Sequence, residues 1–149
     1  MPSKLQNLHL ANNRLSDLGC GGDHQLPSPF EGCHDLQIIS LANNNITTMC
    51  SEWLQQPNLK TINLRRNSIS NLTWNKQRLG VQYPCANCDV SYNNISVIHI
   101  ENLFAGKWHL AGNPLVCDHS NFEFFRVLHR KVSHPTIYTA AVQCLRAAF

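Results

Sequence analysis

The repeat that decides the fold is clearest at residues 36–46, which read LQIISLANNNI. Counted from Leu36, apolar residues stand at offsets +3, +5 and +10, and an asparagine stands at +8. The alternation at +3 and +5 predicts a short strand with one buried face. The asparagine is expected at a bend, where its amide can bond backbone groups that a turn leaves unpaired.

The same pattern recurs five times along the chain at identical offsets. Offsets 0, +3, +5 and +10 carry apolar residues or cysteine, and offset +8 always carries asparagine. The units begin at Leu5, Leu36, Leu59, Cys85 and Ala105, and their asparagines are Asn13, Asn44, Asn67, Asn93 and Asn113. Because one unit cannot bury its own apolar face, we predict a stack of units whose strands form one parallel sheet.

This spacing, L-x-x-L-x-L-x-x-N-x-L, resembles the leucine-rich repeat family from Leu5 to the C-terminus. The resemblance implies an α/β solenoid, with a short parallel sheet on its concave face and loops or short helical turns on its convex face. It places repeats in residues 1–115 and a C-terminal cap in residues 116–149. A long insertion at 19–35 carries glycine and proline clusters, which favour a loop.

Residues 113–117, NPLVC, resemble the opening of the cysteine-flanked C-terminal cap of extracellular leucine-rich repeat proteins. The resemblance implies a disulfide between Cys117 and Cys144, in a cap reduced by the loss of its other bridge. Ser120 with Glu123 is typical of a capping box that begins a helix. The apolar stripe of this helix, expected to seal the last repeat, consists of Phe122, Phe125, Leu128 (or His129) and Val132.

The seven cysteines leave several pairings open. In the insertion we favour a disulfide between Cys20 and either Cys33 or Cys50. The alternative is a zinc site made of Cys20, His24, Cys33 and His34. Cys85 and Cys88 fall on inward leucine positions, so buried core thiols are favoured over a redox or zinc half-site. Because seven is odd, at least one cysteine stays unpaired or pairs between molecules.

Three N-x-S/T sequons mark candidate glycosylation sites at Asn45, Asn71 and Asn94. Asn45 and Asn94 directly follow the asparagine of their units, where side chains are expected to be exposed. Together with the high cysteine content, the sequons favour an extracellular glycoprotein.

The strand residues at +2, +4 and +6, with those at +7, are expected to line the concave face. They are a mixture of small, polar and charged side chains, which suits a protein or peptide partner. Arginine and tyrosine are enriched where interfaces carry most of their binding energy. The candidate partner-binding residues are Arg65, Arg66, Asp89, Tyr92, Asn63 and His109.

Composition and motifs exclude several classes of function. A net charge of +3 is too small to indicate nucleic-acid binding. No run of roughly 18 apolar residues is present that could span a membrane. The sequence has no phosphate-binding glycine loop, no G-x-S-x-G and no H-E-x-x-H, so neither catalysis nor a cofactor or metal is expected.

We therefore expect a non-catalytic recognition module, the C-terminal part of an extracellular leucine-rich repeat protein. The resemblance to Toll-like receptor ectodomains and to secreted insect leucine-rich immune proteins implies innate immunity or cell-surface recognition. Two alternatives stay open: an intracellular (cytoplasmic) scaffold with reduced cysteines, and an extracellular adhesive or matrix protein. No cap precedes Leu5 and the start lacks a signal peptide, so we expect a fragment that can form homodimers through its N-terminal edge.

Overall fold

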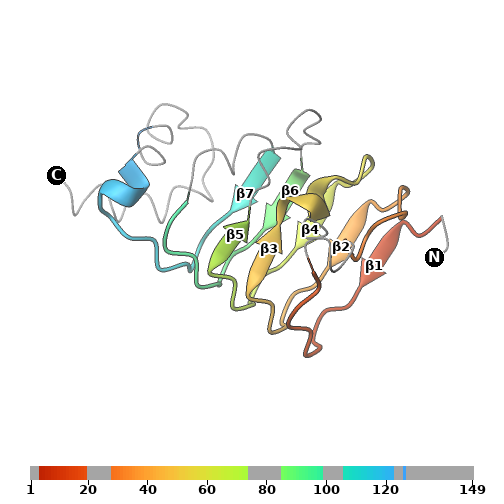
Figure 1. Ribbon diagram of the computed structural model, residues 1–149, viewed down its shortest axis with the longest axis horizontal. Coiled ribbons are helices and arrows are strands. Elements are labelled where there is room, and N and C mark those ends of the chain that lie inside the picture. Colours follow the sequence, from red (N-terminus) through yellow and green to blue (C-terminus); the bar gives the residue numbers. More distant parts are fainter. Residues whose placement is uncertain (1–3, 20–27, 74–84, 99–105, 123–125, 127–149) are drawn as a thin grey trace.

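The computed structural model describes residues 4–19, 28–73, 85–98, 106–122 and 126. Each repeat unit contributes one short strand to a five-stranded sheet (Figure 1). Its strands, in spatial order, are β1 (Asn7–His9), β2 (Ile38–Ser40), β4 (Thr61–Asn63), β6 (Cys85–Asp89) and β7 (Gly106–His109). All neighbouring pairs run parallel, so the predicted parallel sheet is confirmed.

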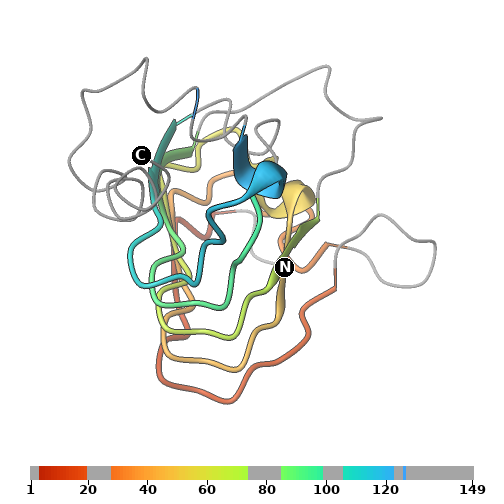
Figure 2. The ribbon, with the colours of Figure 1, turned by 90° about the vertical axis from the view of Figure 1, so that its left-hand side faces the viewer.

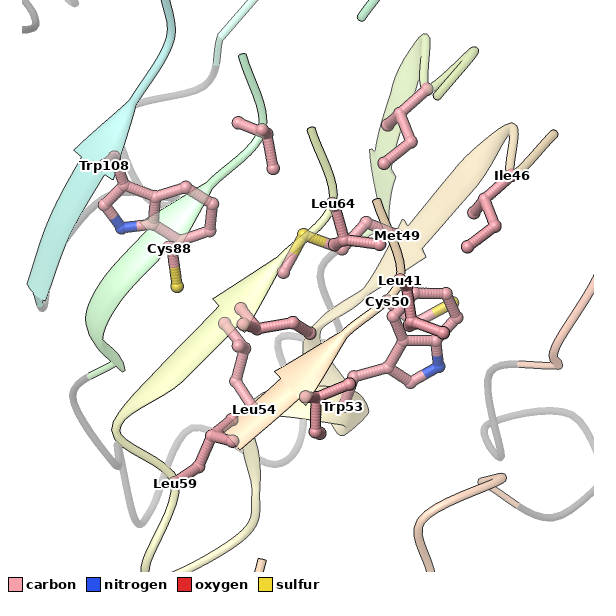
Figure 3. Packing of buried hydrophobic residues seen from close by; sticks show 14 of the residues in the cluster. Leu41, Ile46, Met49, Cys50, Trp53, Leu54, Leu59, Leu64, Cys88 and Trp108 are labelled. Atoms are coloured by element: carbon pink, nitrogen blue, oxygen red, sulfur yellow. The ribbon is translucent and has the colours of Figure 1, made fainter. Parts of the chain in front are cut away.

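The interior of the stack is built from the +3, +5 and +10 residues of the units. The strands pair the +3 residues in register, Leu8 with Ile39, Ile39 with Ile62, and Ile62 with Cys88. Figure 3 shows these side chains in one cluster with Met49, Cys50, Trp53 and Leu54, which come later in the second unit. Fully buried positions include Ile39, Leu41, Ile46, Ile62, Leu64, Ile69, Cys88, Val90 and Ile95. Burying one aliphatic side chain of this size contributes about 1.5–3 kcal/mol, so this core is the main source of stability.

A second, two-stranded parallel sheet lies on the opposite side of the stack (Figure 2). It pairs β3 (Thr48–Cys50) with β5 (Asn71–Thr73), and the 3-10 turn η1 (Ser51–Leu54) follows β3. This sheet was not predicted, because only loops or helical turns were expected on that side. Its cause is the apolar residue at +13, since Met49 of one unit stands in register with Leu72 of the next.

The asparagines at +8 join successive units through what we call the asparagine ladder: Asn44, Asn67, Asn93 and Asn113. The side-chain oxygen of each accepts the backbone N–H at +10 of the preceding unit, over 2.9–3.1 Å. Each amide nitrogen donates to the +5 carbonyl oxygens of its own and the preceding unit, over 2.9–3.0 Å. The predicted role of these asparagines at a bend is confirmed, because they satisfy backbone groups that would otherwise be buried unpaired.

The chain after the fifth unit departs from the prediction in two ways. A 3-10 turn, η4 (His119–Asn121), precedes the predicted helix and is capped by Asp118, whose carboxylate accepts the N–H of Ser120. Glu123, the partner of Ser120 in the predicted capping box, lies outside the described residues. Phe122, expected in the sealing stripe, is 59% exposed, whereas Asn121 is fully buried. Asn121 is the buried residue because the backbone groups around this position need a hydrogen-bond partner, and a phenylalanine side chain has none to offer.

The helix predicted to seal the last repeat is described only in its first part. Phe122 and Arg126 are helical, whereas the rest of the predicted stripe, Phe125, Leu128, His129 and Val132, lies outside the described residues. The predicted cap in residues 116–149 therefore stays a prediction over most of its length.

No helix in the described part of the chain is long and apolar enough to cross a membrane.

Candidate partner-binding surface

The solvent face of the five-stranded sheet carries the residues predicted to bind a partner. Its central row holds the +4 residues, which the strand pairings place side by side: His9, Ser40, Asn63, Asp89 and His109. Three of the six candidates, Asn63, Asp89 and His109, therefore lie next to one another across β4, β6 and β7. All three are partly exposed.

Asn63 and Asp89 both fix the backbone at the end of their strands. The side-chain oxygen of Asn63 accepts the N–H of Arg65 at 3.0 Å. The carboxylate of Asp89 accepts the N–H of Ser91 at 3.0 Å and its hydroxyl at 2.5 Å. Such bonds from Asx side chains to a backbone N–H two residues on are typical of turns. Both candidates thus position the residues that come after them, and Ser91 was not among the predicted residues.

The other three candidates come together in what we call the Arg–Tyr cluster: Arg65, Arg66 and Tyr92. The guanidinium carbon of Arg65 lies 4.6 Å from the centroid of the Tyr92 ring, and that of Arg66 lies 5.8 Å away. Both distances fall within the range of a cation–π contact. The ring itself is 48% exposed. The cluster thus presents two positive charges and an aromatic surface to solvent, from two units that are adjacent in the sheet.

The backbone at +7 has a left-handed conformation in every unit. The φ angles are 59° at Asn12, 54° at Asn43, 55° at Arg66, 55° at Tyr92 and 71° at Gly112. In the first four units this conformation lets the +7 N–H donate to the +6 carbonyl of the next unit, over 2.8–3.1 Å. Asparagine and glycine adopt a positive φ more readily than arginine and tyrosine do. Two members of the cluster therefore occupy positions that disfavour their residue types.

Gly112 supports the Tyr92 ring and was missed in the sequence analysis. A Cβ atom at Gly112 would lie 2.6 Å from Cδ1 of Tyr92 and 2.9 Å from its Cε1, closer than real contacts allow. The ring therefore rests against the backbone of the fifth unit because that unit has no side chain at +7. The alignment of the units contained the signal, since Gly112 stands in register with Tyr92 and Arg66.

His109 lies apart from the Arg–Tyr cluster and has a partner of its own. Its Nε2 atom is 2.7 Å from the side-chain oxygen of Asn87 on the neighbouring strand. The oxygen can only accept, so this bond requires that Nε2 carry the proton. Asn87 was grouped with the concave face but not among the six candidates. Together the two side chains extend the polar part of the surface across β6 and β7.

The cysteines are placed only in part. Cys50, Cys88 and Cys117 are disulfide-bonded, and Cys50 and Cys88 are buried. Cys88 thus fills the inward leucine position as predicted, but its sulfur is not the thiol we expected. The position in the repeat determines whether a side chain is buried, whereas a disulfide forms only where a second sulfur lies at bonding distance. The side chain of Cys85 lies outside the described part of the structure.

The remaining cysteine predictions stay predictions. Cys20, His24 and Cys144 lie outside the described residues, which leaves untested the Cys117–Cys144 bridge and both pairings of Cys20. Cys33 is buried, and His34 is exposed. Among the described residues, no three His, Cys, Asp or Glu side chains are grouped so as to hold a metal ion.

The candidate glycosylation sites lie outside the five-stranded sheet. Asn45 and Asn94 are both exposed, as predicted. Their backbone N–H groups donate to the carbonyls of Leu15 and Ile69 in the preceding units, each over 2.8 Å. The backbone at each site is therefore held by the stack, while its side chain is accessible. The side chain of Asn71, in β5, is not described.

A comparison with known families bears on this surface. The leucine rich repeat family model matches residues 34–76, which contain the second and third units. A leucine-rich repeat therefore occupies this part of the chain. Together with the parallel sheet and the scarcity of helices, it fits a leucine-rich-repeat-like α/β fold. Leucine-rich repeats commonly bind proteins, so the match indicates a protein-binding module. A comparison with curated proteins finds no match.

Proposed function

We propose that this protein binds a protein partner through the solvent face of its five-stranded sheet and has no catalytic activity. The observation that carries the proposal is the Arg–Tyr cluster, in which Arg65 lies 4.6 Å from the exposed ring of Tyr92. Arginine and tyrosine contribute most to binding when they are held in place, because little side-chain entropy is then lost. The leucine-rich repeat at residues 34–76 supports the same function.

Site-specific photo-crosslinking tests which surface binds. We would place p-benzoylphenylalanine at His9 or Lys107, which are exposed on the sheet face. Matched positions Arg14 and Ser68, both at +9 and exposed, lie beyond the bend of their units. We expect one protein to crosslink from the sheet positions only, and to bind in purified form. Equal crosslinking from Arg14 and Ser68 would contradict the proposal.

We further propose that the protein is extracellular and acts in innate immunity or cell-surface recognition. Support comes from the disulfide-bonded Cys50, Cys88 and Cys117, because disulfides persist in oxidising compartments. The exposed sequons at Asn45 and Asn94 add to it. The alternatives are an intracellular scaffold, which would keep its cysteines reduced, and an extracellular adhesive or matrix protein.

Counting free thiols separates these alternatives. The protein would be secreted from eukaryotic cells behind an added signal peptide, alkylated without reduction and weighed intact. We expect a bridge between Cys117 and Cys144, closing a cap in residues 116–149, and glycan on Asn45 or Asn94. Seven free thiols without glycan would favour the intracellular scaffold. Glycosylated, bridged protein that crosslinks only to matrix components would favour the adhesive role.

We also propose that two copies can pair through the edge of the sheet formed by β1. This edge exposes Leu10, at 37%, with half-buried Leu5, Leu8 and Leu15 behind it. In the described residues the side-chain oxygen of Asn13 accepts no hydrogen bond, unlike those of the asparagine ladder. An unpaired strand edge with apolar side chains favours association.

Sedimentation of the whole chain tests this pairing. We expect a concentration-dependent dimer that Leu10→Lys converts to a monomer. Val116→Lys is the matched control, because Val116 is 38% exposed and follows β7, the strand at the opposite edge of the sheet from β1. A monomeric parent protein, or an equal effect of Val116→Lys, would contradict pairing through β1.

A further inference from the structure

The +7 row holds a contrast between units that packing does not explain. The fold requires a left-handed backbone at this position, and the first, second and fifth units supply Asn12, Asn43 and Gly112. The third and fourth units instead supply Arg66 and Tyr92, both at φ 55°. Non-glycine residues held in this region cost stability and cluster at ligand-binding sites. The two exceptions touch each other, which points to a binding role for the pair.

The positive charges of the cluster are not neutralised within the described residues. Neither Arg65 nor Arg66 forms an ion pair there, and both guanidinium groups lie over the Tyr92 ring. Asp89, which is paired with Asn63 on the neighbouring strand, directs a carboxylate oxygen to the N–H and hydroxyl of Ser91. The guanidinium N–H groups are therefore available to an anion from outside.

Charge on the rest of the sheet face has the same sign. At +2, +4, +6 and +7 the five units carry three permanent positive charges, on Arg65, Arg66 and Lys107, against one carboxylate, on Asp89. The +6 row is otherwise small, with Ala11, Ala42, Ser91 and Ala111. An extended chain can therefore approach Arg65 along this row from either side.

We propose that Arg65 and Arg66, held against Tyr92, bind carboxylate side chains of an acidic segment in the protein partner. This inference rests on the proposed function and names the chemistry of the partner. A guanidinium offers paired N–H donors that match a carboxylate in a bidentate geometry. Two such groups on one aromatic ring suit two carboxylates of one extended segment. A nucleic acid is less suited, because its affinity depends on many phosphate contacts.

Fluorescence anisotropy of the full chain with fluorescein-labelled hexaglutamate tests the site. We expect saturable binding that weakens with added salt. Arg66→Asn should raise Kd about tenfold, which corresponds to about 1.4 kcal/mol, because charge-assisted hydrogen bonds are lost. Arg65→Gln should have a similar effect. The matched control is Arg14→Gln, which removes the same charge from an exposed arginine beyond the bend, and should leave Kd within about twofold.

The choice of Arg66→Asn keeps folding and binding separate. Asparagine already occupies this position in two units, as Asn12 and Asn43, so the variant should fold with an unchanged or higher Tm. Weaker binding by a protein of equal or higher Tm cannot come from unfolding. Tyr92→Asn should behave in the same way, with both arginines present but no longer held on the ring.

Three outcomes would overturn the inference: unchanged hexaglutamate binding by Arg66→Asn, an equal loss in Arg14→Gln, or stronger competition from single-stranded DNA or dextran sulfate than from unlabelled hexaglutamate. The crosslinking experiment from His9 and Lys107 is independent of these results. If it succeeds while hexaglutamate fails, only the acidic chemistry of the partner is wrong. If hexaglutamate binds as expected but crosslinks form from Arg14 and Ser68, the partner-binding face is wrong.

Discussion

The side-chain oxygen of Asn121 accepts the backbone N–H of Ile98 at 2.8 Å. The amide nitrogen of Asn121 donates to the carbonyls of Ser96 at 2.8 Å and Val116 at 2.7 Å. Asn121 thus bonds one N–H and two carbonyls, as the ladder asparagines do, but at other positions: Ile98 is at +13 of the fourth unit, and Ser96 and Val116 are at +11 of the fourth and fifth units. The fourth and fifth units are therefore joined to the η4 turn by a buried amide.

Removal of this amide should destabilise the protein more than removal of the neighbouring aromatic ring. Asn121→Ala leaves the Ile98 N–H and two carbonyls without their partner, at a cost of about 1–3 kcal/mol in the free energy of unfolding. Phe122→Ala, at a side chain that is 59% exposed, should cost about 0.5 kcal/mol or less. Urea denaturation measures both. The reverse order would mean that Phe122 seals the stack after all.

Within the asparagine ladder, Asn93 should be the most sensitive position. Its side chain makes four hydrogen bonds to backbone groups, and all four belong to buried residues: Leu64, Ile69, Val90 and Ser91. Asn44 also makes four, but two of its partner residues, Leu10 and Leu15, are not buried. We expect Asn93→Ala to lower the free energy of unfolding by about 3 kcal/mol, because several buried groups lose their partner together. Asn94→Ala, one residue away and exposed, is the control and should have little effect on denaturation.

Gly112 and Gly32 separate two costs of adding a methyl group. Both have a positive φ, but a Cβ at Gly32 meets nothing within 4 Å, whereas one at Gly112 meets the Tyr92 ring at 2.6 Å. We expect Gly32→Ala to lose about 1 kcal/mol from backbone strain alone and Gly112→Ala to lose about 1–3 kcal/mol more from overpacking. Combining Gly112→Ala with Tyr92→Asn should recover the difference. Equal losses for the two alanines would show that the ring moves aside freely.

The Asp118 cap should be sensitive to acid. The hydrogen bond from the Ser120 hydroxyl, and to a lesser extent the one from the Ser120 N–H, lowers the pKa of Asp118 below its usual 3.8. Its contribution to stability is therefore fully present above pH 3.8 and is lost as pH falls through the lower folded-state pKa. The amide chemical shift of Ser120, followed by NMR, should titrate below pH 3.8. Asp118→Asn should abolish this titration, and a midpoint at or above 3.8 would contradict the hydrogen-bonded cap.

The sequence by itself determined the repeat, its buried positions and its bends. The offsets +3, +5 and +10 predicted the buried residues of the second, third and fourth units, and Asn44, Asn67, Asn93 and Asn113 were placed correctly at the bends. The prediction was correct because every unit has the same local structure, a strand followed by a turn whose backbone groups need partners. The six candidate surface residues came from the same alignment, although their function stays a proposal.

Only the tertiary structure decided the features that depend on contacts between units. The second sheet exists because Met49 and Leu72 meet across neighbouring units. Tyr92 contacts Arg65 and Arg66 because a ladder of backbone bonds holds both +7 residues in left-handed conformations and Gly112 leaves room for the ring. Asn121, and not the predicted Phe122, lies in the interior because buried polar groups require hydrogen-bond partners. The hydrophobic periodicity of a sequence does not show where those groups lie.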